Sequence, residues 1–142
     1  MNKILMNTLI VVSAVGGAFI GRWAVDGLFT RTDDHTKILM KAASELNENL
    51  PMTVDSETIL VTTVGAGETF KYVYKLTNSE LSEINVTKFR EYMQPTLYNS
   101  VCTADSMSEF RKMQITVIFS YLDVASKYIT ELPVDTKDCK KA

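Results

Sequence analysis

The feature that most constrains this chain is an uncharged, apolar segment near its N-terminus, from Ile4 to Gly21. The segment is roughly 18 residues long, close to the ~20 helical residues that cross a bilayer core about 30 Å thick. Arg22 can extend its charge to the membrane interface, and Trp23 is typical of that depth. Residues 1–25 are therefore predicted to form a transmembrane signal anchor.

A cleavable signal peptide is the alternative for the same segment. Lys3 supplies the positive charge that precedes such peptides, and residues 14–16 (Ala-Val-Gly) offer small side chains for cleavage. The apolar run continues past this point through Phe19 and Ile20, which is long for a signal peptide. This length favours the uncleaved anchor.

Gly17 and Gly21 are spaced four residues apart within the apolar segment. Small residues at this spacing let two membrane helices approach closely, so the pair predicts a homodimer formed through the membrane helix. The alternative is that small residues are simply common in membrane helices.

The chain has two cysteines, Cys102 and Cys139. Cys139 lies in a polar C-terminal tail, where a thiol gains little from packing. A disulfide between the two would fasten the tail to the second predicted helix, and the closed loop would contribute about 3–4 kcal/mol through loop-closure entropy. Two free thiols are the alternative.

The cysteines also bear on which side of the membrane the domain lies. Arg22, Arg31, Lys37 and Lys41 follow the apolar segment and only Lys3 precedes it, which mildly favours a cytoplasmic domain. Disulfides, however, persist in oxidising compartments. We give the cysteines more weight and predict a single-pass protein of the bacterial inner membrane with its domain in the periplasm.

Residues 26–36 are expected to be a polar tether, and residues 37–142 a periplasmic α+β domain. In this domain the hydrophobic pattern changes between the 3.6-residue spacing of helices and the alternation of strands. Helices are predicted for residues 37–49 and from Asn85 to Val101, with a short one ending at Met113, and strands for Thr58–Val64, Glu68–Leu76, Ile115–Leu122 and Tyr128–Val134. This order predicts a small four-stranded, mainly antiparallel sheet with helices on one face. Pro95 is expected to kink or split the second helix.

An aromatic row, Phe70, Tyr72 and Tyr74, alternates along the second predicted strand. Such alternation is typical of a half-buried strand, so we expect these side chains to lie in the core under the helices. The functional alternative is that part of the row lines a groove for a partner helix.

The sequence lacks the residue patterns of common enzymes and cofactor sites. Its one histidine, His35, stands beside Asp33 and Asp34, a cluster more typical of a solvated helix start than of a metal site. No catalytic residue, metal site or cofactor is predicted. The formal net charge of −2 also argues against nucleic-acid binding.

Several short strings resemble a known family. Asn49-Leu50-Pro51-Met52 ends the first helix, Val101-Cys102-Thr103-Ala104-Asp105 ends the second, and Asp138-Cys139 closes the domain. Over roughly residues 35–139 the chain resembles the AspS-type pilotins of type II secretion systems. The resemblance implies an α/β domain with a Cys102–Cys139 bridge that binds a helical segment of the outer-membrane secretin. Pilotins are normally lipoproteins, whereas this sequence has no Leu-x-x-Cys lipobox.

These observations together predict a non-enzymatic, membrane-anchored periplasmic domain that binds a protein partner in a secretion or envelope assembly. The residues that contact the partner are not predicted. Two alternatives stay open, namely an anchored immunity or superinfection-exclusion factor, and a small domain that binds a ligand between its helices and sheet.

Overall fold

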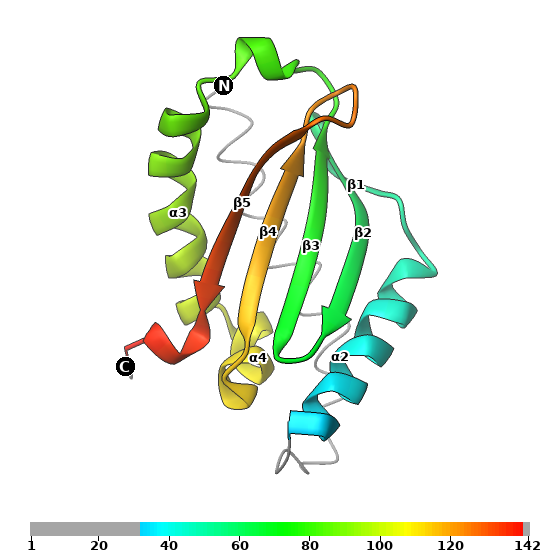
Figure 1. The fold of residues 1–142 in the computed structure, drawn as a ribbon, viewed down its shortest axis with the longest axis vertical. Coiled ribbons are helices and arrows are strands. Elements are labelled where there is room, and N and C mark those ends of the chain that lie inside the picture. The colour runs from blue at the N-terminus through cyan, green and yellow to red at the C-terminus, as the bar shows by residue number, and fades with distance from the viewer. Residues whose placement is uncertain (1–31, 141–142) are drawn as a thin grey trace.

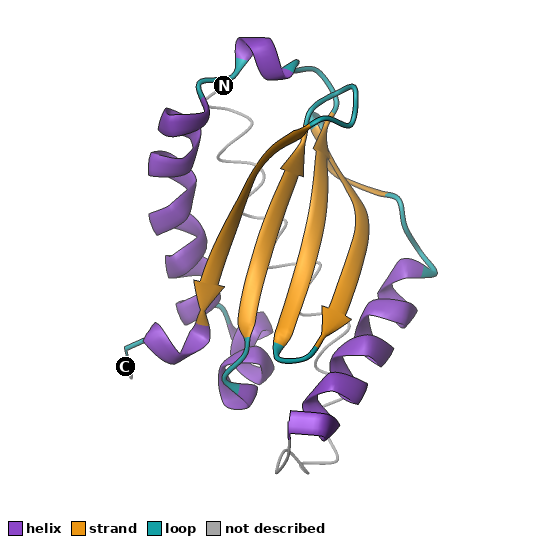
Figure 2. Cartoon of the chain, in the orientation of Figure 1, coloured by secondary structure: helices purple, strands orange, loops and turns teal. Residues whose placement is uncertain are grey.

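The computed structural model describes residues 32–140, which form one five-stranded sheet with helices packed against it (Figures 1 and 2). The strands are β1 (Met52–Asp55), β2 (Thr58–Ala66), β3 (Thr69–Leu76), β4 (Thr116–Leu122) and β5 (Tyr128–Asp135). The helices are α2 (Thr32–Asn47), α3 (Val86–Thr103) and α4 (Ser108–Met113). Short 3-10 turns lie at Leu81–Glu83, Asp105–Met107 and Thr136–Asp138.

The strands lie in the order β1-β2-β3-β4-β5, and the sheet is mixed. The pairs β1–β2, β2–β3 and β4–β5 are antiparallel, while β3 and β4 are parallel. The expectation of an α+β domain with a mainly antiparallel sheet is confirmed, but the predicted four strands are corrected to five. The missed strand, β1, is four residues long, too short to show an alternating pattern.

Helix α2 begins at Thr32. Residues 32–36, which were predicted to belong to the polar tether, are therefore helical. Asp34 lies in its first turn, where a carboxylate interacts favourably with the positive end of the helix dipole. The helix ends at Asn47, two residues before the predicted end at Asn49.

No helix within residues 32–140 is long and apolar enough to cross a membrane. The predicted anchor at residues 1–25, with Gly17 and Gly21, lies outside the described residues. Its prediction therefore stays a prediction.

The core lies between the sheet and the three helices. Along β3, Phe70, Tyr72, Tyr74 and Leu76 are buried, while the residues between them are half-exposed. Apolar side chains of α2, α3 and α4 belong to the same buried cluster, namely Leu39, Ala42, Ala43, Leu46, Phe89, Met93, Leu97, Val101, Phe110 and Met113. The predicted core position of the aromatic row is thus confirmed, and the helices share one face of the sheet.

Helix α3 runs unbroken through Pro95, contrary to the alternative in which this proline splits it. Asn85 caps the helix, because its side chain accepts a hydrogen bond from the Lys88 N–H at 3.0 Å. Pro95 is exposed, so the carbonyl that loses its N–H partner can be hydrated. The Thr96 hydroxyl also donates to the Tyr92 carbonyl one turn earlier, at 2.8 Å.

Side chains from the helices pair with backbone groups along the β5 edge and along the part of β2 that β1 does not cover. Along the β5 edge, three α3 residues spaced four apart donate to backbone carbonyls: Arg90 to Glu131 (3.3 Å), Gln94 to Pro133 (2.8 Å) and Tyr98 to Asp138 (2.6 Å). Four-residue spacing places side chains on one face of a helix, so this face of α3 follows the edge strand. A strand edge covered in this way cannot readily accept a further strand.

Asn47, the last residue of α2, closes the β2 edge beyond the short strand β1. Its side-chain amide donates to the Thr63 carbonyl and its oxygen accepts from the Thr63 N–H, both at 2.8 Å. The amide therefore pairs with Thr63 as a neighbouring strand would. Close by, a Cβ on Gly65 would collide with the backbone of Leu39, so only glycine allows α2 to lie this near.

We predict that Asn47→Ala lowers the free energy of unfolding by about 2–3 kcal/mol, because it leaves both backbone groups of Thr63 without partners at a part-buried position. Chemical denaturation followed by circular dichroism measures the change. Asn49→Ala is the matched control and should change stability by less than about 0.5 kcal/mol, since Asn49 is exposed. Equal effects from the two variants would contradict the pairing.

Candidate partner-binding site

Three buried tyrosines form a cluster on the helix-bearing face of β3 and β4, and we call Tyr72, Tyr74 and Tyr121 the tyrosine cluster. The parallel register sets Tyr74 opposite Tyr121. Their ring centroids are 5.5 Å apart, and those of Tyr72 and Tyr74 are 6.2 Å apart. Phe89 from α3 meets Tyr121 edge-on at 5.1 Å. Offset and edge-on contacts of this kind hold the rings in fixed orientations.

The hydroxyl groups of the tyrosine cluster are buried, and none has a hydrogen-bond partner among the described residues. Burial raises the pKa of all three phenols. The nearby Asp55 carboxylate adds to the effect on the pKa of Tyr121, and the Oδ2 atom of Asp55 is likewise buried without a partner. A buried hydroxyl left without a partner costs about 1–3 kcal/mol, so the cluster holds hydrogen-bonding capacity that the described residues do not satisfy.

The tyrosine cluster lies on the strands between the two long helices, α2 and α3. α2 packs mainly on β2 and α3 mainly on β5, so β3 and β4 lie in the middle (Figure 1). Aromatic rings on neighbouring strands make an apolar platform, and their hydroxyls can both donate and accept hydrogen bonds. All three side chains are fully buried in the structure, so an apolar segment with a few polar groups reaches them only by replacing what covers them.

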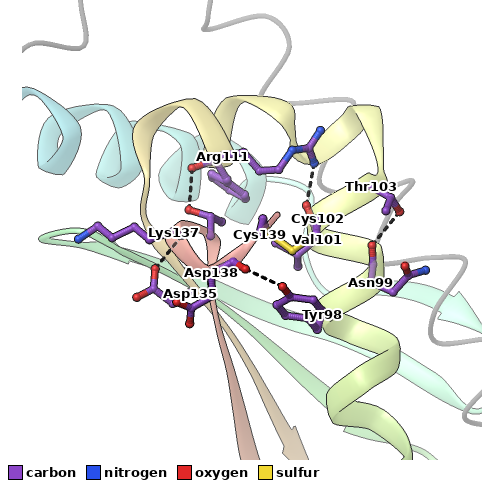
Figure 3. Close-up of a disulfide and its surroundings, with 12 residues drawn as sticks. Tyr98, Asn99, Val101, Cys102, Thr103, Arg111, Asp135, Lys137, Asp138 and Cys139 are labelled. Atoms are coloured by element: carbon purple, nitrogen blue, oxygen red, sulfur yellow. Dashed lines mark hydrogen bonds between the residues drawn. A yellow bond between two sulfur atoms is a disulfide. The ribbon is translucent and has the colours of Figure 1, made fainter. Parts of the chain in front are cut away.

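The Cys102–Cys139 pair lies at one end of this layer, where the structure joins the two in a disulfide (Figure 3). Their Cα atoms are 5.2 Å apart. The bond connects the last turn of α3 to the 3-10 turn after β5, as the sequence predicts. Arg111 of α4 donates to the carbonyls of Val101 and Ala104, both at 2.7 Å, and so supplies partners for the open end of α3.

The other residues singled out in the sequence lie apart from this site. His35 lies in the first turns of α2, and residues 32–140 contain no group of three or more metal-ligating side chains. Sequence reasoning missed Tyr121 and Asp55 as members of the site. Tyr121 lies in a strand that is apolar on both faces, and its position opposite Tyr74 depends on the parallel pairing that was not predicted.

Comparison with known proteins places the fold in a recognisable class. No family model matches the chain. Protein K of Escherichia coli is 32% identical over 92 residues, which make up 63% of this chain and 49% of that protein. The chain thus spans about half the length of this relative.

Three solved structures share the fold. A candidate secreted protein of Pseudomonas aeruginosa superposes with a TM-score of 0.63 and 14% identity, covering 77% of this chain and 96% of that one. The type 2 secretion pilotin EpsS of Vibrio vulnificus gives 0.61 and 9%, covering 78% and 96%. The type II secretion pilotin AspS of Vibrio cholerae gives 0.57 and 11%, covering 76% and 94%. At these identities the likeness concerns the fold, so the chain has a pilotin-like fold, and it carries a disulfide.

We predict that replacing both cysteines, Cys102→Ser with Cys139→Ser, lowers the free energy of unfolding by about 3–4 kcal/mol, because the unfolded chain regains the freedom of a loop of 37 residues. Denaturation with and without reductant measures this. Reductant should bring the wild-type protein to the midpoint of the variant and leave the variant unchanged. A midpoint that does not move in either comparison would refute the contribution.

A second prediction concerns alkaline pH. The pKa values of the tyrosine cluster are raised in the folded protein above their ordinary value near 10, so the unfolded chain loses these protons first. Their contribution to stability is complete below pH ~10 and is lost as the pH rises further. Tyrosinate absorbance and circular dichroism should show the three phenols ionising together with unfolding. Their ionisation in the intact fold would contradict the burial.

Proposed function

We propose that this chain is a non-enzymatic interaction domain that acts outside the cytoplasm, as an accessory to a secretion assembly. EpsS and AspS, which share its fold, are pilotins of such systems. The Cys102–Cys139 disulfide supports an oxidising compartment, in agreement with the periplasm. In this proposal residues 1–25 anchor the domain in the inner membrane.

The observation that carries the proposal is the set of buried hydroxyls in the tyrosine cluster that have no hydrogen-bond partner among residues 32–140. A partner that brings polar groups onto β3 and β4 would satisfy these hydroxyls and recover part of the cost of burying them. The cluster also consists of large, rigid aromatic side chains, a type enriched among the residues that dominate binding energy in protein interfaces. They are fully buried, so the proposed partner takes the place of what covers them.

The coverage of the sheet edges favours a helical partner over an added strand. Because Asn47 covers the part of β2 beyond β1 and α3 covers the β5 edge, strand addition is limited to the outer edge of β1, which is four residues long. A helix lying across the middle strands needs no free edge. The proposed partner is therefore an apolar helical segment with polar groups on its contact face, such as the secretin segment that the pilotin resemblance implies.

The test is binding of a synthetic peptide from the C-terminal segment of the outer-membrane secretin encoded by the same genome, with the full chain held in a neutral detergent. Tyr74→Phe should weaken binding about fivefold, the value of one hydrogen bond, without lowering the free energy of unfolding. Fluorescence anisotropy measures the affinity, and chemical denaturation measures the stability.

Tyr92→Phe is the matched control, because Tyr92 is exposed on α3 and lies outside the tyrosine cluster. It should leave the affinity within twofold of wild type. The proposal fails if the wild-type chain does not bind the peptide, or if both variants weaken binding equally.

A further inference from the structure

A surface hollow of about 620 Å³ lies beside the disulfide, apart from the tyrosine cluster. It is bounded by Cys102 and Thr103 at the end of α3, by α4 and Gln114, and, after β5, by Thr136, Lys137, Cys139 and Lys140. The disulfide joins two of its walls, so their separation is fixed covalently (Figure 3).

The charge of this hollow is opposite to that of the chain. The chain has a formal net charge of −2, yet four of its 15 Lys and Arg residues line the hollow and no acidic residue does. These four are Arg111, Lys112, Lys137 and Lys140. Like charges held at one concave site raise the local concentration of anions.

Three of the four cations keep binding capacity within the described part of the chain. Lys112 is paired with Glu109 at 2.7 Å, but Arg111, Lys137 and Lys140 have no ion pair among residues 32–140. The hydrogen bonds of Arg111 to Val101 and Ala104 both use Nη1. Its other nitrogens are therefore left for a ligand.

Polar groups around the hollow suit an anion with several oxygens. Ser108 and Gln114 line it and add neutral side-chain donors to the cations. Two carboxylates belong to the same turn, Asp135 and Asp138, and neither lines the hollow. Asp135 accepts from the Lys137 backbone N–H at 3.0 Å. An arginine fork, two lysines and neutral donors are the groups that recognise phosphate oxygens.

We propose that this hollow binds a phosphate group, and that its source is the head group of an anionic phospholipid. The hollow is larger than one phosphate ion needs and has room for a glycerol-bearing head group. It also lies at the end of the domain where α2 begins, since the Thr36 hydroxyl of α2 meets Gly67 at the β2–β3 turn and Glu68 meets Thr116 at the start of β4 (Figure 1).

The choice of a lipid source rests on the proposed function. If residues 1–25 anchor the chain, the domain end nearest the membrane is the end that holds the hollow. The recognition of phosphate itself rests only on the residues that line the hollow, so it is tested independently of the anchor.

The experiment titrates the full chain, in a neutral detergent, with dihexanoyl phosphatidylglycerol, dihexanoyl phosphatidylcholine and inorganic phosphate, and follows the amide resonances of α4 and residues 136–140. Phosphatidylglycerol should bind at least about tenfold more tightly than phosphatidylcholine, and the affinity should fall as salt is raised. The double variant Lys137→Gln/Lys140→Gln should weaken binding about tenfold. The charge-matched control Lys75→Gln/Lys88→Gln should stay within twofold of wild type.

The outcomes test both the phosphate site and the source of the phosphate group. Inorganic phosphate that binds as tightly as phosphatidylglycerol supports the site and overturns the lipid source. Equal binding of the two lipids, or equal loss in both double variants, overturns the site, as does binding of an acidic peptide alone. Cell fractionation reports on the anchor separately, so a failed anchor and a failed phosphate site are distinguishable.

Discussion

The parallel pairing of β3 with β4 is the constraint on which the rest of this domain depends. Two parallel neighbours need a crossover connection, and this one consists of the segment between Leu76 and Thr116 that contains α3 and α4. The crossover returns the chain to the end of the sheet where β3 began and sends α3 along the outer strand β5. Both the covered β5 edge and the approach of Cys102 to Cys139 follow from that path.

The same pairing creates the tyrosine cluster. In a parallel register Tyr72 lies opposite Phe119 and Tyr74 opposite Tyr121, so the aromatic rows of two distant segments become one surface. Because α2 and α3 pack on β2 and β5, this surface lies between the helices. At its centre the sheet thus carries hydroxyls that have no partner among residues 32–140, while helix side chains cover β5 and the part of β2 beyond β1. This is the reverse of a domain that binds by strand addition.

The sequence predicted what local patterns control. The alternation in β3 and the start of α3 after Asn85 are local features, and they lie where the residues indicate. It could not predict β1, since four residues show no period, or the position of Tyr121, since register between strands far apart in sequence depends on packing across the whole sheet. The unpartnered state of the three hydroxyls follows from the same packing, so only Tyr72 and Tyr74 could be singled out beforehand, as members of an aromatic row.

The disulfide connects the two candidate sites in physical terms. It holds the last turn of α3 against the chain after β5, and α3 also supplies Phe89 against Tyr121. A helix fixed at its C-terminal end by Cys102 and along its length by Arg90, Gln94 and Tyr98 has little freedom to move toward the middle strands. The tyrosine cluster therefore keeps its shape without a partner, and a segment that binds there does so without the cost of ordering α3. The same disulfide also fixes two walls of the basic hollow, so the cations that line it are held near one another before an anion binds.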